Sequence, residues 1–282
     1  MPDRPAASTT APARRHRRPT SGRAGGGTLL TDYGRRVIAP IVAVLAALTL
    51  NARADEVSVA VAANFARPLA KIGEGYTAAT GHTLKLSSGS TGKFYSQIVA
   101  GAPFDVLIAA DDETPKKLVS EGLAVTGSNF TYAIGKLVLW SAQPGYVDDQ
   151  GAVLASGKFT HLAIANPKLA PYGQAGTEVL KARGLSESVA PKLVTAESIA
   201  QAYQFVATGN AELGFVALSQ VATPGKAVTG SYWLVPPSLY GEIRQDALLL
   251  KTGEKNAAAA ALLSYLKSTA AKAVIASYGY EH

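Results

Sequence analysis

Four short polar turns contain the residues of this sequence that are best suited to bind a ligand, and each lies between a predicted strand and a predicted helix. They are Ala63-Asn64-Phe65, Gly89-Ser90-Thr91-Gly92, Pro171-Tyr172-Gly173 and Ala196-Glu197-Ser198-Ile199. The first N–H groups of a helix have no partner within the helix, and the helix dipole adds partial positive charge there. Several such ends directed at one point hold an anion without Lys or Arg. Together with the hydroxyl and amide donors of these turns, the pattern predicts an anion site.

Each of these residues also has an ordinary structural interpretation. Asn64 and Ser90 or Thr91 are common N-cap residues, which bind only the backbone of their own helix. Tyr172 follows a proline and is equally compatible with a loop aromatic, and Ile199 alone would be assigned to the core. The functional hypothesis therefore depends on all four turns lying at the same end of two sheets.

Composition and motifs argue against several other chemistries. The 282 residues include no Cys, and the four His are not spaced as metal ligands, which excludes thiolate chemistry and disfavours a His-based metal centre or triad. The segment SGSTGK resembles a phosphate-binding loop, but Ser87 stands where that motif needs Gly. The acids at 111–113 are explained by the start of a helix. We therefore predict no catalytic residues, no cofactor and no resident metal.

Apolar, β-rich segments alternate with amphipathic segments from Asp55 onward, an order that is typical of a parallel sheet with helices on both faces. The first series has predicted strands at 57–63, 83–89 and 104–110. A long apolar segment at 132–142 leads into a second series, with predicted strands at 161–167, 192–198 and 212–218. An Ala-rich segment at 258–279 predicts a helix that packs back on the first series.

This order predicts an α/β protein with two lobes, in which each lobe is a mainly parallel sheet flanked by helices. Lobe one would comprise residues 55–138 and 238–282, and lobe two residues 139–237. A ligand cleft is expected between the lobes, at the carboxyl ends of the strands. The two extended crossings would act as a hinge.

The excess positive charge is confined to the first 54 residues. The chain has 27 basic and 20 acidic side chains, a net charge of +7, but residues 1–54 contain nine Arg and two Asp. The remaining part has 18 side chains of each sign and no cluster of Lys or Arg. A nucleic-acid-binding surface needs a basic stripe in the folded part of the chain, so we do not expect nucleic acid as a partner.

Residues 1–54 are predicted to be an export signal with a low-complexity basic extension. Arg35 and Arg36 precede the 13 apolar residues IAPIVAVLAALTL, and Ala52-Arg53-Ala54 has the small-x-small pattern typical of a signal peptidase site. As a helix this segment would reach about 20 Å, too short for the roughly 30 Å hydrocarbon core of a bilayer. We expect cleavage near Ala54 and a periplasmic location.

The chain also resembles the periplasmic molybdate-binding proteins of the type II solute-binding fold, over nearly all of residues 56–280. The matching segments are AVAANF, SSGSTGKFYSQIVAGAPFDVLIAADDETPKKL, TYAIGKLVLWSA, NPKLAPYGQAGTEVL and ELGFVAL. The resemblance implies a receptor that binds molybdate or tungstate and delivers it to the membrane permease of an ABC importer. It implies a monomer, with molybdenum present only as the molybdate oxyanion.

In that family, backbone amides and uncharged side chains from these turns hold the anion. The resemblance implies as ligand-binding residues Ala63, Asn64, Ser90, Thr91, Tyr172 and Ile199. Whether Ser90 or Thr91 supplies the hydroxyl is open, although the spacing back from Gln97 favours Thr91. Tyr172 is expected to be the main side-chain anchor from lobe two, reaching the anion when the lobes close.

The sequence differs from the family pattern at two positions. Many relatives have Ser at the position of Asn64, and a Tyr in the second-lobe strand where this chain has Ala217. The alternative functions are a receptor for sulfate, phosphate or an iron complex, and an enzyme on the same fold. The lack of an acid/base set favours a receptor.

Overall fold

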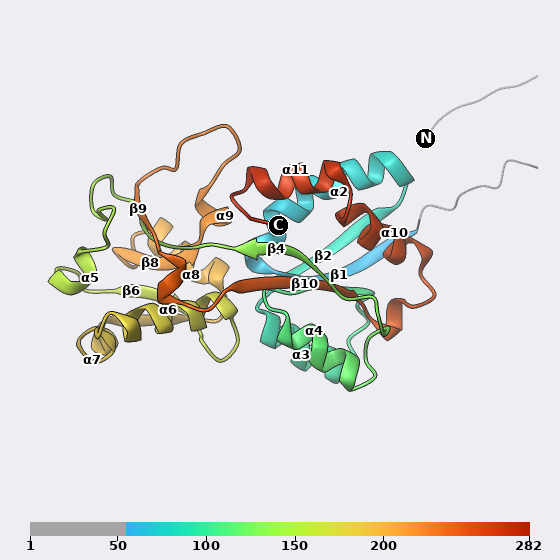
Figure 1. Ribbon diagram of the computed structural model, residues 1–282, viewed down its shortest axis with the longest axis horizontal. Helices are drawn as coiled ribbons and strands as arrows, with labels where there is room; N and C mark the ends of the chain where they lie inside the picture. The colour runs from blue at the N-terminus through green and yellow to red at the C-terminus, as the bar shows by residue number, and fades with distance from the viewer. Residues whose placement is uncertain (1–54) are drawn as a thin grey trace, which may run out of the picture. The chain divides into compact units, whose positions relative to one another are not determined.

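Two five-stranded sheets form the framework of the protein (Figure 1). The structure is a computed structural model and describes residues 55–282, so the predicted export signal and its cleavage site lie outside the described residues. The strand orders are β2-β1-β3-β10-β4 and β7-β6-β8-β5-β9. The predicted fold class is confirmed: two α/β lobes, each with its own sheet and flanking helices.

The first sheet is built from both ends of the described chain. Its strands are β1 (Glu56–Ala62), β2 (Thr83–Gly89), β3 (Val106–Ile108), β4 (Phe130–Gly135) and β10 (Ile243–Leu249). Strand β1 pairs in parallel with β2 and β3, whereas β10 pairs antiparallel with β3 and β4. Strand β10 therefore runs against the other four.

Helices cover both faces of this sheet because β1 is apolar on both sides. Val57, Val59 and Val61 pack under one group of helices, and Ala60 packs under the other. The first group is α2 (Ala66–Thr80), α10 (Ala257–Leu266) and α11 (Thr269–Ser277), and the second is α3 (Thr91–Val99) and α4 (Glu113–Ser120) (Figure 1).

The prediction of a single Ala-rich helix at 258–279 is wrong, because this segment forms the two helices α10 and α11. Ser268 divides it, because its hydroxyl caps α11 by accepting from the N–H of Ala271 at 3.2 Å.

The second sheet repeats the plan. Its strands are β5 (Leu137–Ser141), β6 (Leu162–Ala165), β7 (Leu193–Ala196), β8 (Leu213–Ala217) and β9 (Ser231–Leu234). Helices α6 (Pro171–Ala182) and α8 (Ile199–Ala207) cover opposite faces. Gly176 of α6 lies against Phe215, whereas Gly214 on the same strand faces Val206 of α8, so each glycine permits close helix–sheet packing. The shorter elements are α5 (Val153–Ser156), α7 (Ser186–Val189), α9 (Leu218–Val221), η2 (Ala190–Lys192), η3 (Pro237–Leu239) and η4 (Lys251–Gly253).

The chain passes between the two sheets twice. The apolar segment at 132–142 leads from one sheet to the other, as expected, and contains parts of two strands. Lys136 separates β4 from β5, and the two strands belong to different sheets. The carbonyl of Lys136 accepts from the N–H of Leu218 at 2.9 Å. The return passage runs from β9 through η3 to β10. The predicted lobe limits at 138 and 238 lie near these passages.

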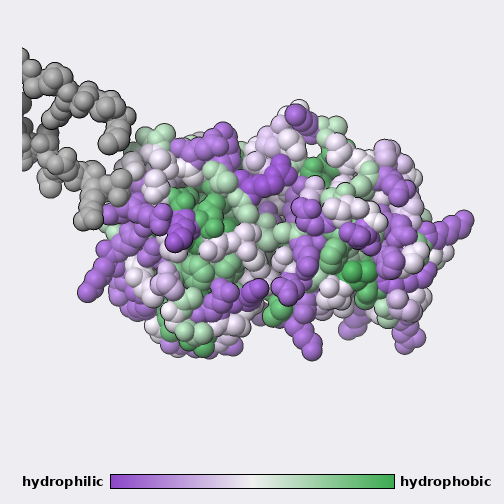
Figure 2. All heavy atoms as spheres, turned by 180° about the vertical axis from the view of Figure 1, so that it is seen from behind, coloured by the Kyte–Doolittle hydropathy of each residue, from purple (hydrophilic) through white to green (hydrophobic). Residues whose placement is uncertain are grey.

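Polar and apolar side chains are intermixed on the surface. On the face shown in Figure 2, hydrophilic side chains surround smaller hydrophobic areas. The large hydrophobic side chains most exposed among the described residues are Val99, Tyr232 and Leu234. Within residues 55–282 no helix combines the length and apolarity needed to cross a membrane, and no group of His, Cys, Asp and Glu is arranged to hold a metal ion.

Candidate anion-binding site

A small cavity lies where the ends of strands from both sheets meet the starts of helices. Its volume is about 10 Å³, so a ligand that it holds must be compact. It is lined by Ala62, Ala63, Asn64, Gly89, Ser90, Thr91, Ala110, Ala170, Pro171, Tyr172 and Ile199. The structure thus brings all six predicted site residues to one place. None of the lining side chains carries a charge at neutral pH.

Three helices of eight or more residues begin at this cavity. Helix α3 begins at Thr91 in lobe one, and α6 and α8 begin at Pro171 and Ile199 in lobe two. Because α6 begins at Pro171, Tyr172 lies in the first turn of this helix and not in a loop. Three partial positive charges from both lobes therefore converge on the cavity, which favours an anion.

The two neighbouring hydroxyls of the second turn differ in their partners. Thr91 Oγ1 accepts a hydrogen bond from the N–H of Ala110 at 3.0 Å. Ser90 precedes α3 as its N-cap residue but its side chain does not cap the helix, and its Oγ is buried without a hydrogen-bond partner among the described residues. Such a group costs free energy unless a ligand satisfies it. Thr91 Oγ1 accepts and so keeps its own proton, which means that either hydroxyl can donate to a ligand. The buried oxygen without a partner makes Ser90 the stronger candidate, against the preference drawn from spacing.

Asn64 also does not act as an N-cap. Its Nδ2 donates to Gln245 Oε1 and to the hydroxyl of Tyr280, both at 2.9 Å, so both amide protons are used within the protein. Its carbonyl accepts from Ser219 Oγ of lobe two at 2.9 Å. Its Oδ1 is buried without a partner among the described residues. The amide donor expected from this side chain is thus not free in this arrangement.

The Tyr172 hydroxyl is positioned by a residue of the other lobe. Gln245 Nε2, on β10, donates to Tyr172 Oη at 2.9 Å. Tyr172 is 1% exposed, and burial is the main cause that raises its pKa well above the ordinary value. The side chain is therefore a neutral phenol that accepts one hydrogen bond from Gln245 and keeps its own proton for another acceptor.

Sequence reasoning missed two buried glutamines that support the site. Gln245 contacts Asn64 and Tyr172 directly. Gln220 Nε2 donates to the carbonyl of Ile199 at 3.0 Å, while its Oε1 accepts from the N–H of Ala217. A signal for Gln245 is present in the sequence, because it occupies a core-facing position in the period-two pattern of IRQDALL.

The two lobes are in contact around the cavity. The N–H of Gly92 donates to the carbonyl of Leu169 at 3.0 Å, and Arg67 Nη1 donates to the carbonyl of Gln220 at 3.0 Å. An exposed ion pair joins Lys93 and Glu197 at 3.6 Å. Because the pair is exposed, it adds little to the contact. The two hydrogen bonds to the carbonyls of Leu169 and Gln220 are the more important links.

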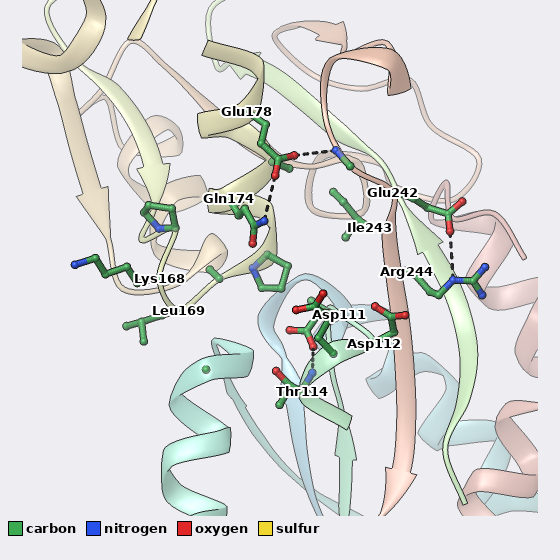
Figure 3. A pocket seen from close by; sticks show the side chains of 18 residues that line it. Asp111, Asp112, Thr114, Lys168, Leu169, Gln174, Glu178, Glu242, Ile243 and Arg244 are labelled. Atoms are coloured by element: carbon green, nitrogen blue, oxygen red, sulfur yellow. Dashed lines mark hydrogen bonds and ion pairs between the residues drawn. The ribbon is translucent and has the colours of Figure 1, made fainter. Parts of the chain in front are cut away.

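A larger and more open cavity of about 340 Å³ adjoins the small one (Figure 3). Its walls share Ala110, Ala170 and Pro171 with the small cavity, but they also carry the acids Asp111, Asp112, Glu113, Glu178 and Glu242. Burial is the main cause that raises the pKa of Asp111 above its ordinary value. These five acids outnumber the two basic side chains of the lining, Lys168 and Arg244, so the larger cavity is less suited to an anion than the small uncharged one.

Comparison with known proteins places the chain in a family. Residues 57–281 match the bacterial extracellular solute-binding proteins, and the chain belongs to that family. It is 60% identical over 233 residues to the molybdate-binding protein ModA of Azotobacter vinelandii, an alignment that covers 83% of this chain and 92% of the relative. The ModA of Rhodobacter capsulatus is 55% identical, with 87% and 96% covered. The resemblance seen in the sequence is confirmed.

A solved structure agrees with this assignment. The periplasmic molybdate-binding protein of Azotobacter vinelandii superimposes with a TM-score of 0.79 at 44% identity, covering 80% of this chain and 99% of that one. The sulfate-binding protein SubI of Mycobacterium tuberculosis superimposes with a TM-score of 0.63 at 14% identity. At that identity the likeness concerns the fold alone.

Proposed function

We propose that this protein is a receptor for molybdate or tungstate that delivers the anion to the membrane permease of an ABC importer. The observation that carries the proposal is the small uncharged cavity, where three helix N-termini meet a serine hydroxyl that has no partner within residues 55–282. A compact dianion satisfies these donors and needs no counter-cation. The names of the relatives with 60% and 55% identity support molybdate as that anion.

Binding follows from contacts in both lobes. Lobe one offers the hydroxyl of Ser90 and the helix start at Thr91, and lobe two offers the hydroxyl of Tyr172 and the helix start at Ile199. An anion bridging the two sets stabilises the arrangement in which the lobes touch, because it makes all contacts only there. The permease would then receive the protein in that arrangement. No step of this process needs a catalytic group.

The site of action that we infer is the periplasm, with the protein acting as a monomer after cleavage near Ala54. The solved relative from Azotobacter vinelandii is a periplasmic protein by name, which supports this location. N-terminal sequencing of the mature protein from a periplasmic fraction tests it. Recovery of the chain with residues 1–50 intact would contradict it.

Isothermal titration with molybdate, tungstate, sulfate and phosphate tests the ligand. We expect nanomolar to low micromolar Kd values for the first two and binding of sulfate at least a hundredfold weaker, a difference of about 2.7 kcal/mol. Donors fixed around a larger tetrahedron leave sulfate with long hydrogen bonds or with donors unpaired. Sulfate or phosphate binding within tenfold of molybdate would assign the receptor to another oxyanion.

A further inference from the structure

Gln245 lies on β10, the strand that returns the chain to lobe one, where its pairing with β4 is irregular. Gln245 pairs with Ala133 and Asp246 pairs with Thr131, so Tyr132 of β4 is the extra residue of a β-bulge. Helices cover both faces of this sheet, and Gln245 and Asp246 are both buried, with Gln245 completely inaccessible to solvent. A buried amide at this place is costly unless all its hydrogen bonds are made.

The amide of Gln245 makes hydrogen bonds to both lobes. Its Oε1 accepts from Asn64 Nδ2 in lobe one, and its Nε2 donates to Tyr172 Oη in lobe two, each at 2.9 Å. The hydroxyl of Tyr132 on β4 also lies 2.9 Å from Oε1. Asn64 and Tyr172 are 181 and 73 residues away in the sequence. One side chain thus joins the two polar residues that line opposite walls of the cavity.

The polarity of these bonds decides which group can donate to an anion. A hydroxyl that accepts from Gln245 keeps its proton free, so Tyr172 can donate to the cavity. If the oxygen and nitrogen of the Gln245 amide exchanged places, the oxygen would accept a hydrogen bond from the Tyr172 hydroxyl and the nitrogen would face Asn64 Nδ2. The Asn64 amide would then have to reverse as well, because two N–H groups cannot bond each other. The two amides are therefore coupled and turn only together.

We propose that Gln245 is a positioning residue for anion binding, which holds the Tyr172 hydroxyl so that its proton points at the anion. The inference rests on the proposed function and adds to it a residue that does not touch the ligand. In the arrangement in which the lobes touch, the orientation of the anchor from lobe two is therefore set by lobe one. Donors that are already oriented bind a ligand more tightly, because binding then costs little further conformational entropy.

Gln245→Glu tests the polarity. A carboxylate can only accept hydrogen bonds, so it accepts one from the Tyr172 hydroxyl, whose proton is then not available to the anion. The carboxylate also adds negative charge near the dianion. We therefore expect molybdate affinity at pH 8 to fall at least a hundredfold. A protonated Glu again offers one donor and one acceptor, and burial favours that form. Affinity of the variant should therefore recover by tenfold or more at pH 5.5. Asp246→Asn, the neighbouring buried change on the same strand, should bind within twofold of the parent, because Asp246 bonds to Thr131 and not to the site.

The parent protein supplies the reference for this pH profile. Burial raises the pKa of Tyr132, Tyr172 and Tyr280, so these hydroxyls stay neutral between pH 5.5 and 8. Asp111, whose pKa burial also raises, is present in parent and variant alike. Asp246 is also present in both proteins. The difference between the two profiles therefore reports the group at position 245.

A double-mutant cycle separates positioning from stability. Gln245→Met removes the hydrogen bonds to Asn64, Tyr132 and Tyr172 without adding charge. We expect about tenfold weaker molybdate binding in the parent background but no further loss in Tyr172→Phe. A residue that only stabilises the fold would lower Tm equally in both backgrounds and leave affinity alone. Gln245→Glu with parental affinity and pH profile, or equal losses from Gln245→Met in both backgrounds, would overturn the proposal. Failure of the parent to bind any oxyanion would instead overturn the proposed function. If Gln245→Glu does not fold, as judged by circular dichroism, the Gln245→Met cycle decides.

Discussion

The N–H of Gly92 in lobe one donates a hydrogen bond to the carbonyl of Leu169 in lobe two at 3.0 Å. The contact is so close that a Cβ at position 92 would lie 3.1 Å from both Cα and O of Leu169. These are backbone atoms, which cannot turn aside as a side chain can. The glycine therefore matters to the contact between the lobes and not to the fold of either one.

We expect Gly92→Ala to weaken molybdate binding by hindering closure. Overpacking of this kind costs about 1 to 3 kcal/mol, or roughly 5- to 150-fold in Kd. Isothermal titration measures the loss, and small-angle scattering should show a less compact protein with saturating molybdate. Gly73→Ala is the control, because Gly73 lies within α2 and its Cβ would meet only the side chain of Leu84. Equal losses from both variants would exclude a specific effect on closure.

Tyr172→Phe should weaken molybdate binding about 10- to 150-fold, since a hydrogen bond to a charged acceptor contributes about 1.5 to 3 kcal/mol. The structure adds a second effect that the sequence did not indicate. Removing the hydroxyl leaves Gln245 Nε2 without its acceptor, so we also expect a loss of about 1 to 3 kcal/mol in stability. Titration and denaturant unfolding measure the two losses separately. An affinity within twofold of the parent would show that the ring only packs.

Ser90→Ala and Thr91→Val should affect different properties. The Ser90 hydroxyl has no partner among the described residues, so its removal should weaken anion binding about tenfold or more without lowering the Tm of the free protein. Thr91→Val takes away the acceptor of the Ala110 N–H and should lower stability by about 1 to 3 kcal/mol, with a smaller change in affinity. The reverse pattern in titrations and melting curves would assign the hydroxyl contact to Thr91.

Asp111→Asn should stabilise the protein at neutral pH. Burial raises the folded-state pKa of Asp111 above its unfolded value, so stability falls as pH rises through the window between the two. The variant lacks this penalty, and the Asn oxygen can still accept from the N–H of Thr114. The gain in Tm should be largest at pH 7 and vanish at low pH. Each kcal/mol gained in the free energy of unfolding should raise Tm by about 2–4 °C. The exposed change Asp149→Asn should give no such pH-dependent gain.

Local patterns predicted the fold and the places where helices begin near strand ends, because both depend on neighbouring residues. The segment Pro171-Tyr172-Gly173 is the exception in detail, since it forms the first turn of α6 itself. Alternation of apolar strands with amphipathic helices is enough to place helix starts at the carboxyl ends of strands. The helix break at Ser268 was missed, because a serine within an Ala-rich segment does not differ locally from one on a helix surface. Only its hydrogen bond to Ala271 makes it a cap.

Side-chain roles within the site depended on partners far away in the sequence. Thr91 Oγ1 accepts from the N–H of Ala110, 19 residues later, whereas Ser90 Oγ has no partner among the described residues. Gln245 was passed over because Asn64 and Tyr172 are brought to it only by the two passages of the chain between sheets. Spacing within a turn contains no information on such pairings.

The uncharged lining of the small cavity has a consequence for the thermodynamics of capture. Eleven residues line this cavity, and one of them, Tyr172, has an ionisable side chain. The raised pKa of Tyr172 keeps this side chain neutral. Entry of a dianion therefore neither takes up nor releases a proton at these side chains. The heat of binding should be the same in buffers of different ionisation enthalpy, and the loaded protein should focus at a lower isoelectric point, because the full charge of the anion is added to it.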